Sequence, residues 1–198
     1  MLKGIDISHH NEAYILKNPE ILKIQDFIIM KASEGVSYID KYKDIYLSLI
    51  DKYQSIGFYH YCRPERGNSP EAEAIHFLNS IRPYIGRAIL AIDVEADALL
   101  YPDIDTWVYE WLEAVYTDTR VRPLVYCSES QCYRFKLAAK NNYGLWCARW
   151  GSEPPRKSKI KPWKFWALWQ NASGRLDRDM FNGDAGAWLA YAKGERAI

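Results

Sequence analysis

The chain has 198 residues, 48% of them apolar, so it is long enough to bury one sizeable core and too apolar to be intrinsically disordered. Its formal net charge of +1 argues against nucleic acid or an anionic membrane surface as a partner. Aromatic residues reach 15%, with 8 Trp and 15 Tyr. Rings that join an apolar face to a polar group suit a sugar-binding cleft as well as a large core.

Short apolar runs recur along the chain at the length of β-strands. Most of them are continuously apolar rather than alternating, which is typical of a parallel sheet covered on both faces. We therefore expect strands at residues 2–7, 27–32, 56–61, 88–94, 123–127, 144–149, 165–170 and 176–181.

Amphipathic stretches separate the first strands, and residues 41–54 show one such apolar face. Polar residues of the kind that cap helices precede the other stretches. We expect these caps at Ser69, Asp105, Ser128 and Asp184, with Trp188 in the final helix.

The pattern changes after residue 150. Residues 151–164 hold three prolines and no helical stripe, which predicts a loop. Residues 171–175 are too few for a helical crossover, so the next strand should return antiparallel as a hairpin. We therefore expect residues 1–198 to form one α/β domain, an irregular TIM-like (β/α)5(β)3 barrel. An open doubly wound sheet is the alternative fold.

The four cysteines, Cys62, Cys127, Cys132 and Cys147, form no CxxC pair, which argues against a zinc site. We expect them to be reduced, as in an intracellular protein. The first residues contain no apolar stretch like that of a signal peptide. No apolar run approaches the ~20 residues that cross a bilayer. These features predict a cytoplasmic chain that does not use a membrane.

Asp93 and Glu95 end one of the apolar runs. Side chains alternate along a strand, so both carboxyl groups should point to one face. In a barrel, the carboxyl end of a strand is where active sites lie. Two neighbouring carboxyl groups repel, so one should keep its proton, and glycosidic cleavage uses such a pair. Two solvated strand-end acids are the plainer alternative.

Asp6 ends the first strand, and Asp177 begins the last one. If the final two strands form a hairpin, Asp177 lies on the same rim as Asp6, Asp93 and Glu95. Asp179 should share its face but lie deeper. A metal is not expected, because the adjacent His9 and His10 would point to opposite faces of an extended chain.

Several motifs together resemble family 25 glycoside hydrolases, the Chalaropsis-type lysozymes. The likeness runs in order from residue 3 to about residue 184. The motifs are DISHHN (6–11), KASEG (31–35), GFYHY (57–61), DVE (93–95), LWCAR (145–149), LWQ (168–170) and LDRDMFNG (176–183).

The resemblance implies a β/α barrel that cleaves the β-1,4 bond between N-acetylmuramic acid and N-acetylglucosamine without metal or other cofactor. Glu95 matches the family's catalytic acid and Asp93 its charge-stabilising aspartate, which would orient the substrate's own 2-acetamido group. Asp6 and Asp177 match two further rim aspartates. Asp179 departs from the family, in which Asn is commoner.

Some side chains near the predicted strand ends are candidates to bind sugar, with core packing as the alternative. They are Tyr61, Tyr126, Trp146 and Gln170. Lys31 is a candidate partner for a rim carboxylate.

A chitinase-like glycosidase, a non-catalytic glycan-binding barrel and a cell-wall amidase or peptidase are the other interpretations. Residues 88–95, AILAIDVE, lack the longer acidic motif of family 18 chitinases. We expect a monomer that acts on peptidoglycan glycan strands, released by lysis as phage endolysins are.

Overall fold

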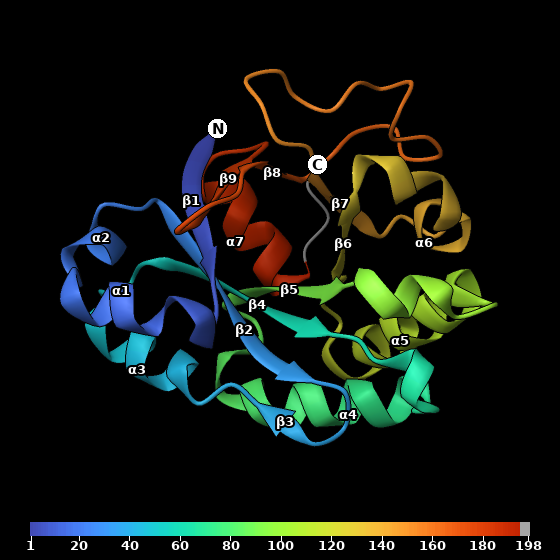
Figure 1. Ribbon diagram of the computed structural model, residues 1–198, viewed down its shortest axis with the longest axis horizontal. Coiled ribbons are helices and arrows are strands. Elements are labelled where there is room, and N and C mark those ends of the chain that lie inside the picture. The colour runs from blue at the N-terminus through green and yellow to red at the C-terminus, as the bar shows by residue number, and fades with distance from the viewer. Residues whose placement is uncertain (195–198) are drawn as a thin grey trace.

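The computed structural model describes residues 1–194, in which eight strands close into a barrel (Figure 1). They are β1 (Leu2–Ile7), β2 (Phe27–Glu34), β4 (Ser55–Tyr61), β5 (Ala88–Asp93), β6 (Leu124–Ser128), β7 (Gly144–Ala148), β8 (Leu168–Ala172) and β9 (Asp177–Phe181).

Around the barrel the order is β1, β9, β8, β7, β6, β5, β4 and β2, and β2 pairs with β1 to close the ring. Neighbouring strands are parallel except where β9 runs antiparallel to both β1 and β8. A two-residue strand, β3 (Tyr38–Ile39), pairs with β2 outside the ring. The predicted (β/α)5(β)3 barrel is therefore confirmed, including its hairpin.

Helices surround most of the barrel. They are α1 (Glu12–Lys17), α2 (Glu20–Lys23), α3 (Tyr42–Leu49), α4 (Pro70–Ile81), α5 (Ile104–Thr119), α6 (Lys136–Lys140) and α7 (Ala185–Lys193). Short 3-10 turns span His9–Asn11, Pro64–Arg66, Arg82–Tyr84, Ala96–Leu100 and Glu129–Arg134. No helix in residues 1–194 combines the length and apolarity that crossing a bilayer requires.

Two of the predicted caps are confirmed. The Ser69 side chain accepts a hydrogen bond from the Ala72 amide at the start of α4, and that of Asp184 accepts one from Ala187 in α7. Asp105 is not a cap, because α5 begins one residue earlier and the Asp105 carboxylate accepts a hydrogen bond from the Leu137 amide instead.

Two further expectations are wrong in detail. Ser128 makes no side-chain cap, and the segment behind it splits into a 3-10 turn and the short α6. The helix expected over residues 41–54 ends at Leu49, since the chain turns before it enters β4.

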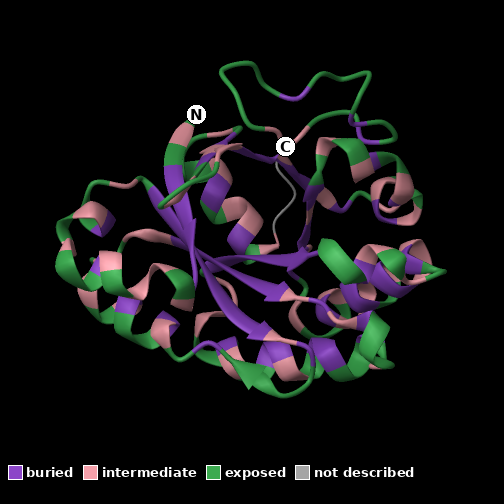
Figure 2. Ribbon diagram, in the orientation of Figure 1, coloured by how far each residue is buried: buried purple, intermediate pink, exposed green. Residues whose placement is uncertain are grey.

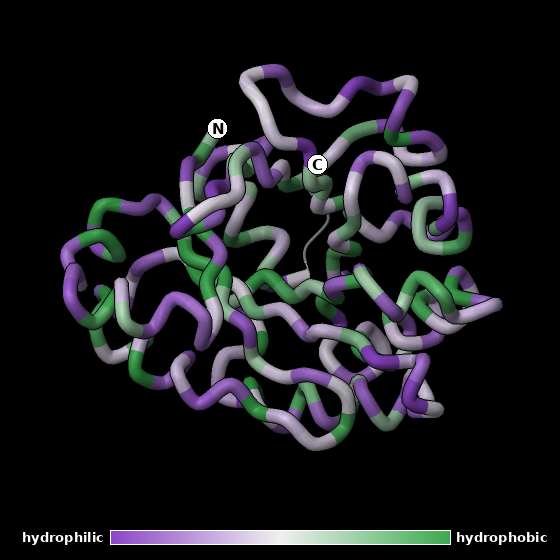
Figure 3. Tube along the Cα trace, viewed as in Figure 1, coloured by the Kyte–Doolittle hydropathy of each residue, from purple (hydrophilic) through white to green (hydrophobic). Residues whose placement is uncertain are grey.

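Alternation along the strands divides the core into two layers, and the buried residues follow the strands in Figure 2. Ile28 packs outward beneath the helices, whereas its neighbour Ile29 points into the bore. Figure 3 shows hydrophobic residues concentrated on the same strands. Helix α7 closes the bore at the end opposite the strands' carboxyl ends, where Trp188 stacks on Phe27 with 4.5 Å between ring centroids.

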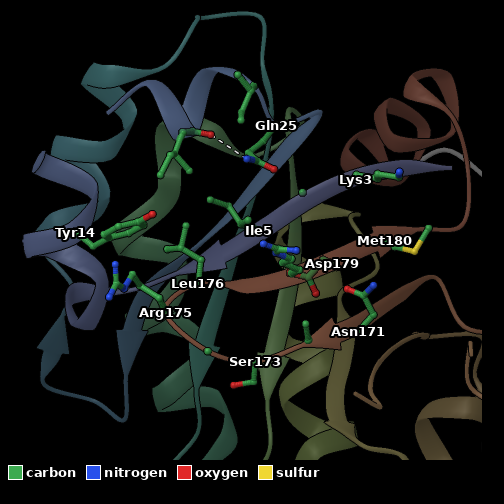
Figure 4. A pocket seen from close by; sticks show the side chains of 16 residues that line it. Lys3, Ile5, Tyr14, Gln25, Asn171, Ser173, Arg175, Leu176, Asp179 and Met180 are labelled. Carbon is green, nitrogen blue, oxygen red and sulfur yellow. Dashed lines mark hydrogen bonds between the residues drawn. The ribbon is translucent and has the colours of Figure 1, made fainter. Parts of the chain in front are cut away.

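The barrel's outer face is bare where β8 returns directly into β9. A groove of about 790 Å³ lies there, between the β1–β9 pair and the helices α1 and α2. Figure 4 shows Ile5 and Met180 on the strand side of the groove and Tyr14 across from them. The groove follows from the missing crossover helix.

Candidate active site

The carboxyl ends of the parallel strands surround a cavity of about 230 Å³. Asp93 is the last residue of β5, Glu95 follows two residues later, and Asp6 lies near the end of β1. Asp177 comes from the start of β9, and because β9 is antiparallel, its first residue pairs with Asp6 across the sheet. All four carboxylates therefore line the same cavity.

Asp93 and Glu95 occupy different depths of this cavity. Asp93 is only 7% exposed, and burial together with repulsion from Glu95 holds the pKa of its carboxyl group well above the ordinary value. Glu95 is exposed at the mouth, yet the protein removes enough water around its carboxyl group to raise its pKa. A raised pKa keeps a carboxylic acid protonated near neutral pH, so that it can donate its proton.

Among the cations, Lys31 on β2 has the largest effect on the pKa values of Asp93 and Glu95. It does not pair with any of the four carboxylates, because its Nζ lies 2.6 Å from Glu34 Oε2. Glu34 also binds Arg63, with 2.6 Å between Oε1 and Nη2. Lys31 nevertheless lowers the pKa of both Asp93 and Glu95, so it partly opposes the effect of burial.

Asp6 also lines the cavity and is 9% exposed. Burial, with repulsion from Asp177 and Glu95, raises its pKa to about 7, against the opposing influence of its polar neighbours Asp179 and Gln170. Gln170 Nε2 donates to Asp6 Oδ2 at 2.8 Å. The amide oxygen of Gln170 in turn accepts from the Tyr126 hydroxyl at 3.0 Å and from Trp150 Nε1 at 3.2 Å. Gln170 thus links the Asp6 carboxylate by hydrogen bonds to the side chains of Tyr126 and Trp150.

Three of the four candidate sugar-binding residues line the cavity: Tyr126, Trp146 and Gln170. Trp146 is 2% exposed, and its ring meets those of Tyr126 and Tyr59 edge-on, at centroid distances of 4.8 and 6.2 Å. Trp146 therefore forms the floor of the cavity rather than an open stacking platform.

Tyr61 is not among the residues that line the cavity. Its ring contacts two cations, with Lys31 Nζ 4.8 Å and Arg63 Cζ 4.5 Å from the centroid. Asp93 and Glu95 are near enough to add to the effect of burial on its pKa, which is raised. Tyr61 therefore lies beside the catalytic candidates, as part of the basic side of the site.

The adjacent histidines do not point apart. His9 and His10 begin a 3-10 turn after the Ser8 cap, and their ring centroids are 3.9 Å apart, so the premise of an extended chain is wrong here. His9 Nδ1 lies 3.0 Å from Asp40 Oδ2. Within residues 1–194 no cluster of three or more His, Cys, Asp or Glu side chains is arranged to hold a metal ion.

The profile of the family described as glycosyl hydrolases family 25 matches residues 5–179. The chain belongs to this family. It is therefore a glycoside hydrolase by descent, and the site just described occupies the carboxyl ends of a family 25 barrel.

Curated relatives agree with that membership, and a solved structure agrees with the fold. Lysozyme M1 of Streptomyces globisporus is 27% identical over 96% of this chain and 71% of its own length. The autolytic lysozyme of Clostridium acetobutylicum is 38% identical over 48% of this chain, which is 28% of that protein. The lysozyme structure from Streptomyces coelicolor has a TM-score of 0.75 at 23% identity, with 98% of both chains covered.

The family 25 site includes residues that the sequence-based reasoning missed, namely Tyr59, Trp150 and Ser173. Tyr59 lies two residues before Tyr61 on β4, so strand alternation places it on the same face and could have indicated it. Trp150 and Ser173 lie in irregular segments after β7 and β8, for which periodicity gives no direction.

Proposed function

We propose that this family 25 hydrolase is an N-acetylmuramidase, which cleaves the β-1,4 bond between N-acetylmuramic acid and N-acetylglucosamine in bacterial peptidoglycan. The observation that carries the proposal is the pair of neighbouring acids on β5 and just beyond it, one buried and one at the mouth of the same cavity. Relatives described as lysozymes support the choice of substrate.

Glu95 is the general acid. Its carboxyl group is at the mouth, where the oxygen that bridges two sugars can reach it, and its raised pKa keeps it protonated for donation. As the proton moves to the bridging oxygen, the bond from that oxygen to the anomeric carbon of muramic acid breaks and positive charge develops on the carbon. The Glu95 carboxylate then takes a proton from the water that completes hydrolysis.

Asp93 orients the substrate's 2-acetamido group. Its Oδ1 is buried, and no group within residues 1–194 donates a hydrogen bond to it. A buried acceptor without a partner is costly, so a ligand N–H that pairs with it is strongly favoured. An acetamido N–H held there places the acetamido oxygen for attack on the anomeric carbon. Lys31 opposes the effect of burial on the pKa of Asp93, and the ionised form of Asp93 stabilises the cation that forms.

Asp6, Asp177, Tyr126, Trp146, Trp150 and Gln170 form the rest of the substrate-binding surface in this proposal. Trp150 is 67% exposed and provides the open ring on which a pyranose can stack, while Trp146 shapes the floor. Tyr61 acts from the side, together with Lys31 and Arg63.

Mass spectrometry of digested peptidoglycan tests the proposal. A muramidase leaves muramic acid at the new reducing ends. Glucosamine at those ends would identify a glucosaminidase, turnover of chitin alone would identify a chitinase-like enzyme, and tight binding without cleavage would identify a glycan-binding barrel. Each of these three results contradicts the proposal.

We also propose that the chain folds in a reducing compartment and reaches the wall on lysis. All four thiols are free and buried, and Cys132 Sγ lies 3.8 Å from Cys127 Sγ and 4.0 Å from Cys147 Sγ, far beyond a bond of ~2.05 Å. Alkylation of the denatured protein without reductant should label all four cysteines. A disulfide between any two of them in the native producing cell would contradict this proposal.

A further inference from the structure

Asp179, on β9, is an acid that the proposed chemistry does not use. It is 2% exposed and lies on the strand face that points into the bore, two residues beyond Asp177. Figure 4 draws it among the residues that border the outer groove, and in the sheet it pairs with Gln170 of β8 on one side and Gly4 of β1 on the other. An ionised carboxylate this deep needs compensation.

The two oxygens of Asp179 have different surroundings. Trp146 Nε1 donates to Oδ1 at 2.8 Å. Oδ2 is buried, and no group within residues 1–194 donates to it. Asp6 and Asp179 are diagonal neighbours across the β1–β9 pair, because Asp6 pairs with Asp177 and Asp179 pairs with Gly4. Gln170, which pairs with Asp179 on β8, donates to Asp6, and each acid influences the pKa of the other. Two carboxylates cannot hydrogen bond to each other unless one of them carries a proton.

The charges around this pair favour that proton. From β9, Asp177 repels both acids, and from the segment after β5, Glu95 repels Asp6. The other polar neighbours include Trp146 on β7 and Gln170 on β8, which are neutral donors. Tyr59 on β4 and Tyr126 on β6 also face the pair, and their hydroxyl groups are neutral because burial raises their pKa values. Lys31 lowers the pKa values of Asp93 and Glu95, but it is not among the principal influences on the pKa of Asp6 or of Asp179. Two full negative charges here would repel each other without a cation between them.

We propose that Asp179 is a positioning residue that keeps its proton on Oδ2 and donates it in a hydrogen bond to the carboxylate of Asp6. Oδ1 is then the carbonyl oxygen, which accepts from Trp146, and Oδ2 is the hydroxyl group, which satisfies the buried atom that otherwise lacks a partner. The two acids share one proton and one negative charge, as other close carboxyl pairs do.

The arrangement fixes both the orientation and the charge of Asp6. Gln170 and Asp179 hold the Asp6 carboxylate from two sides, so its remaining lone pairs face the cavity that Asp6 lines. This inference rests on the proposed function only where it treats Asp6 as a group that meets the sugar. The proton itself can be measured without substrate.

The decisive variant is Asp179→Asn, because an amide has the same shape, donates through its nitrogen and cannot ionise. Difference infrared spectroscopy of the wild type minus this variant at pH 8, above the pKa of about 7 of Asp6, should show the loss of a protonated-carboxyl carbonyl band. Asp97→Asn, at an exposed position, is the control for the substitution itself and should leave this band in place. Loss of an ionised-carboxylate band instead, in Asp179→Asn, would overturn the proposal.

Stability as a function of pH gives a second measurement. Burial raises the pKa of Asp179, so the folded wild type holds a proton that the unfolded chain releases above its ordinary pKa near 4. The folding equilibrium constant of the wild type, divided by that of Asp179→Asn, should therefore fall by up to tenfold for each pH unit above this value. A ratio that is flat or rises with pH would overturn the proposal.

Activity separates this inference from the proposed function. Asp179→Asn should digest peptidoglycan at close to the wild-type rate at neutral pH, because the donor to Asp6 is kept. If neither protein is a muramidase, the infrared and stability results still decide the protonation of Asp179. If the wild type is a muramidase and the variant is inactive although folded, the amide does not replace the acid and the positioning role is wrong.

Discussion

The two ends of the barrel bore are built from the same strands and contrast in chemistry. The end closed by α7 is filled with aromatic rings, Phe27, Phe181 and Trp188. The other end holds buried carboxyl groups, and the oxygens Asp93 Oδ1 and Asp179 Oδ2 have no donor within residues 1–194. The closed end stabilises the fold, and the open end is costly to fold but ready to meet a ligand. Substitutions at the two ends should therefore have opposite kinds of effect.

The largest expected effect is at the open end, in Glu95→Gln. The amide cannot protonate the leaving oxygen, so the rate of release of reducing ends from purified cell walls should fall ~10²–10⁴-fold. The unfolding free energy should change little, because Glu95 is exposed at the mouth. Asp97→Asn, an exposed acid two residues away, is the control and should stay active. Near-full activity of Glu95→Gln would refute its role as the acid.

At the closed end, Trp188→Ala should act on stability. Trp188 is 2% exposed and packs on Phe27 and Phe181, so its removal leaves a large cavity. We expect the unfolding free energy in urea to fall by about 3–5 kcal/mol. Trp150→Ala, at a residue that is 67% exposed, is the matched control and should lose far less. Equal losses in the two variants would mean that α7 does not plug the bore.

Asp93→Asn should move activity and stability in opposite directions. Asn cannot take on negative charge beside the developing cation, so activity should fall by about 10²-fold or more. Burial raises the pKa of Asp93, so the wild type loses stability as pH rises from the unfolded value of ~3.9 towards the folded one. The variant should therefore unfold at a higher temperature than the wild type at pH 7, with a smaller gap at pH 4. A gap that does not depend on pH would contradict this account.

Lys31→Met should have the smallest effect. Lys31 lowers the pKa of Glu95, so its removal should raise that pKa and extend the pH range in which Glu95 is protonated. The alkaline limb of kcat/KM should move upward by up to about one pH unit. Lys52→Met, on the exposed turn after α3, should leave the limb in place. A shift to lower pH would show that Lys31 does not act on Glu95 in this way.

The barrel was predictable because its strands are short apolar runs and its last connection is too short for a helix. Those two patterns also place Asp6, Asp93, Glu95 and Asp177 at one rim, where the cavity is found. The helices α1 and α2 were not predicted, since they have 6 and 4 residues and carry too little periodicity.

How deeply each side chain is buried could not be predicted from the sequence patterns. Trp146 and Trp150 differ by four positions, yet one is buried and the other is 67% exposed, because β7 ends between them. Likewise, the pairing of Lys31 with Glu34 depends on side-chain reach at a strand end. Such contacts are set by packing between distant segments, which no local pattern contains.

Helix α7 also determines where the chain can be attached to something else. It leaves the barrel at the end opposite the acids, and a Cβ built on Gly194 would lie 2.1 Å from the Arg120 carbonyl oxygen, so the backbone there presses against the segment that leads into β6. A bead, an electrode or a carrier polymer coupled to the exposed side of this helix, for example at Leu189, would therefore face away from the cleft, and the immobilised protein should keep its mouth open to solution.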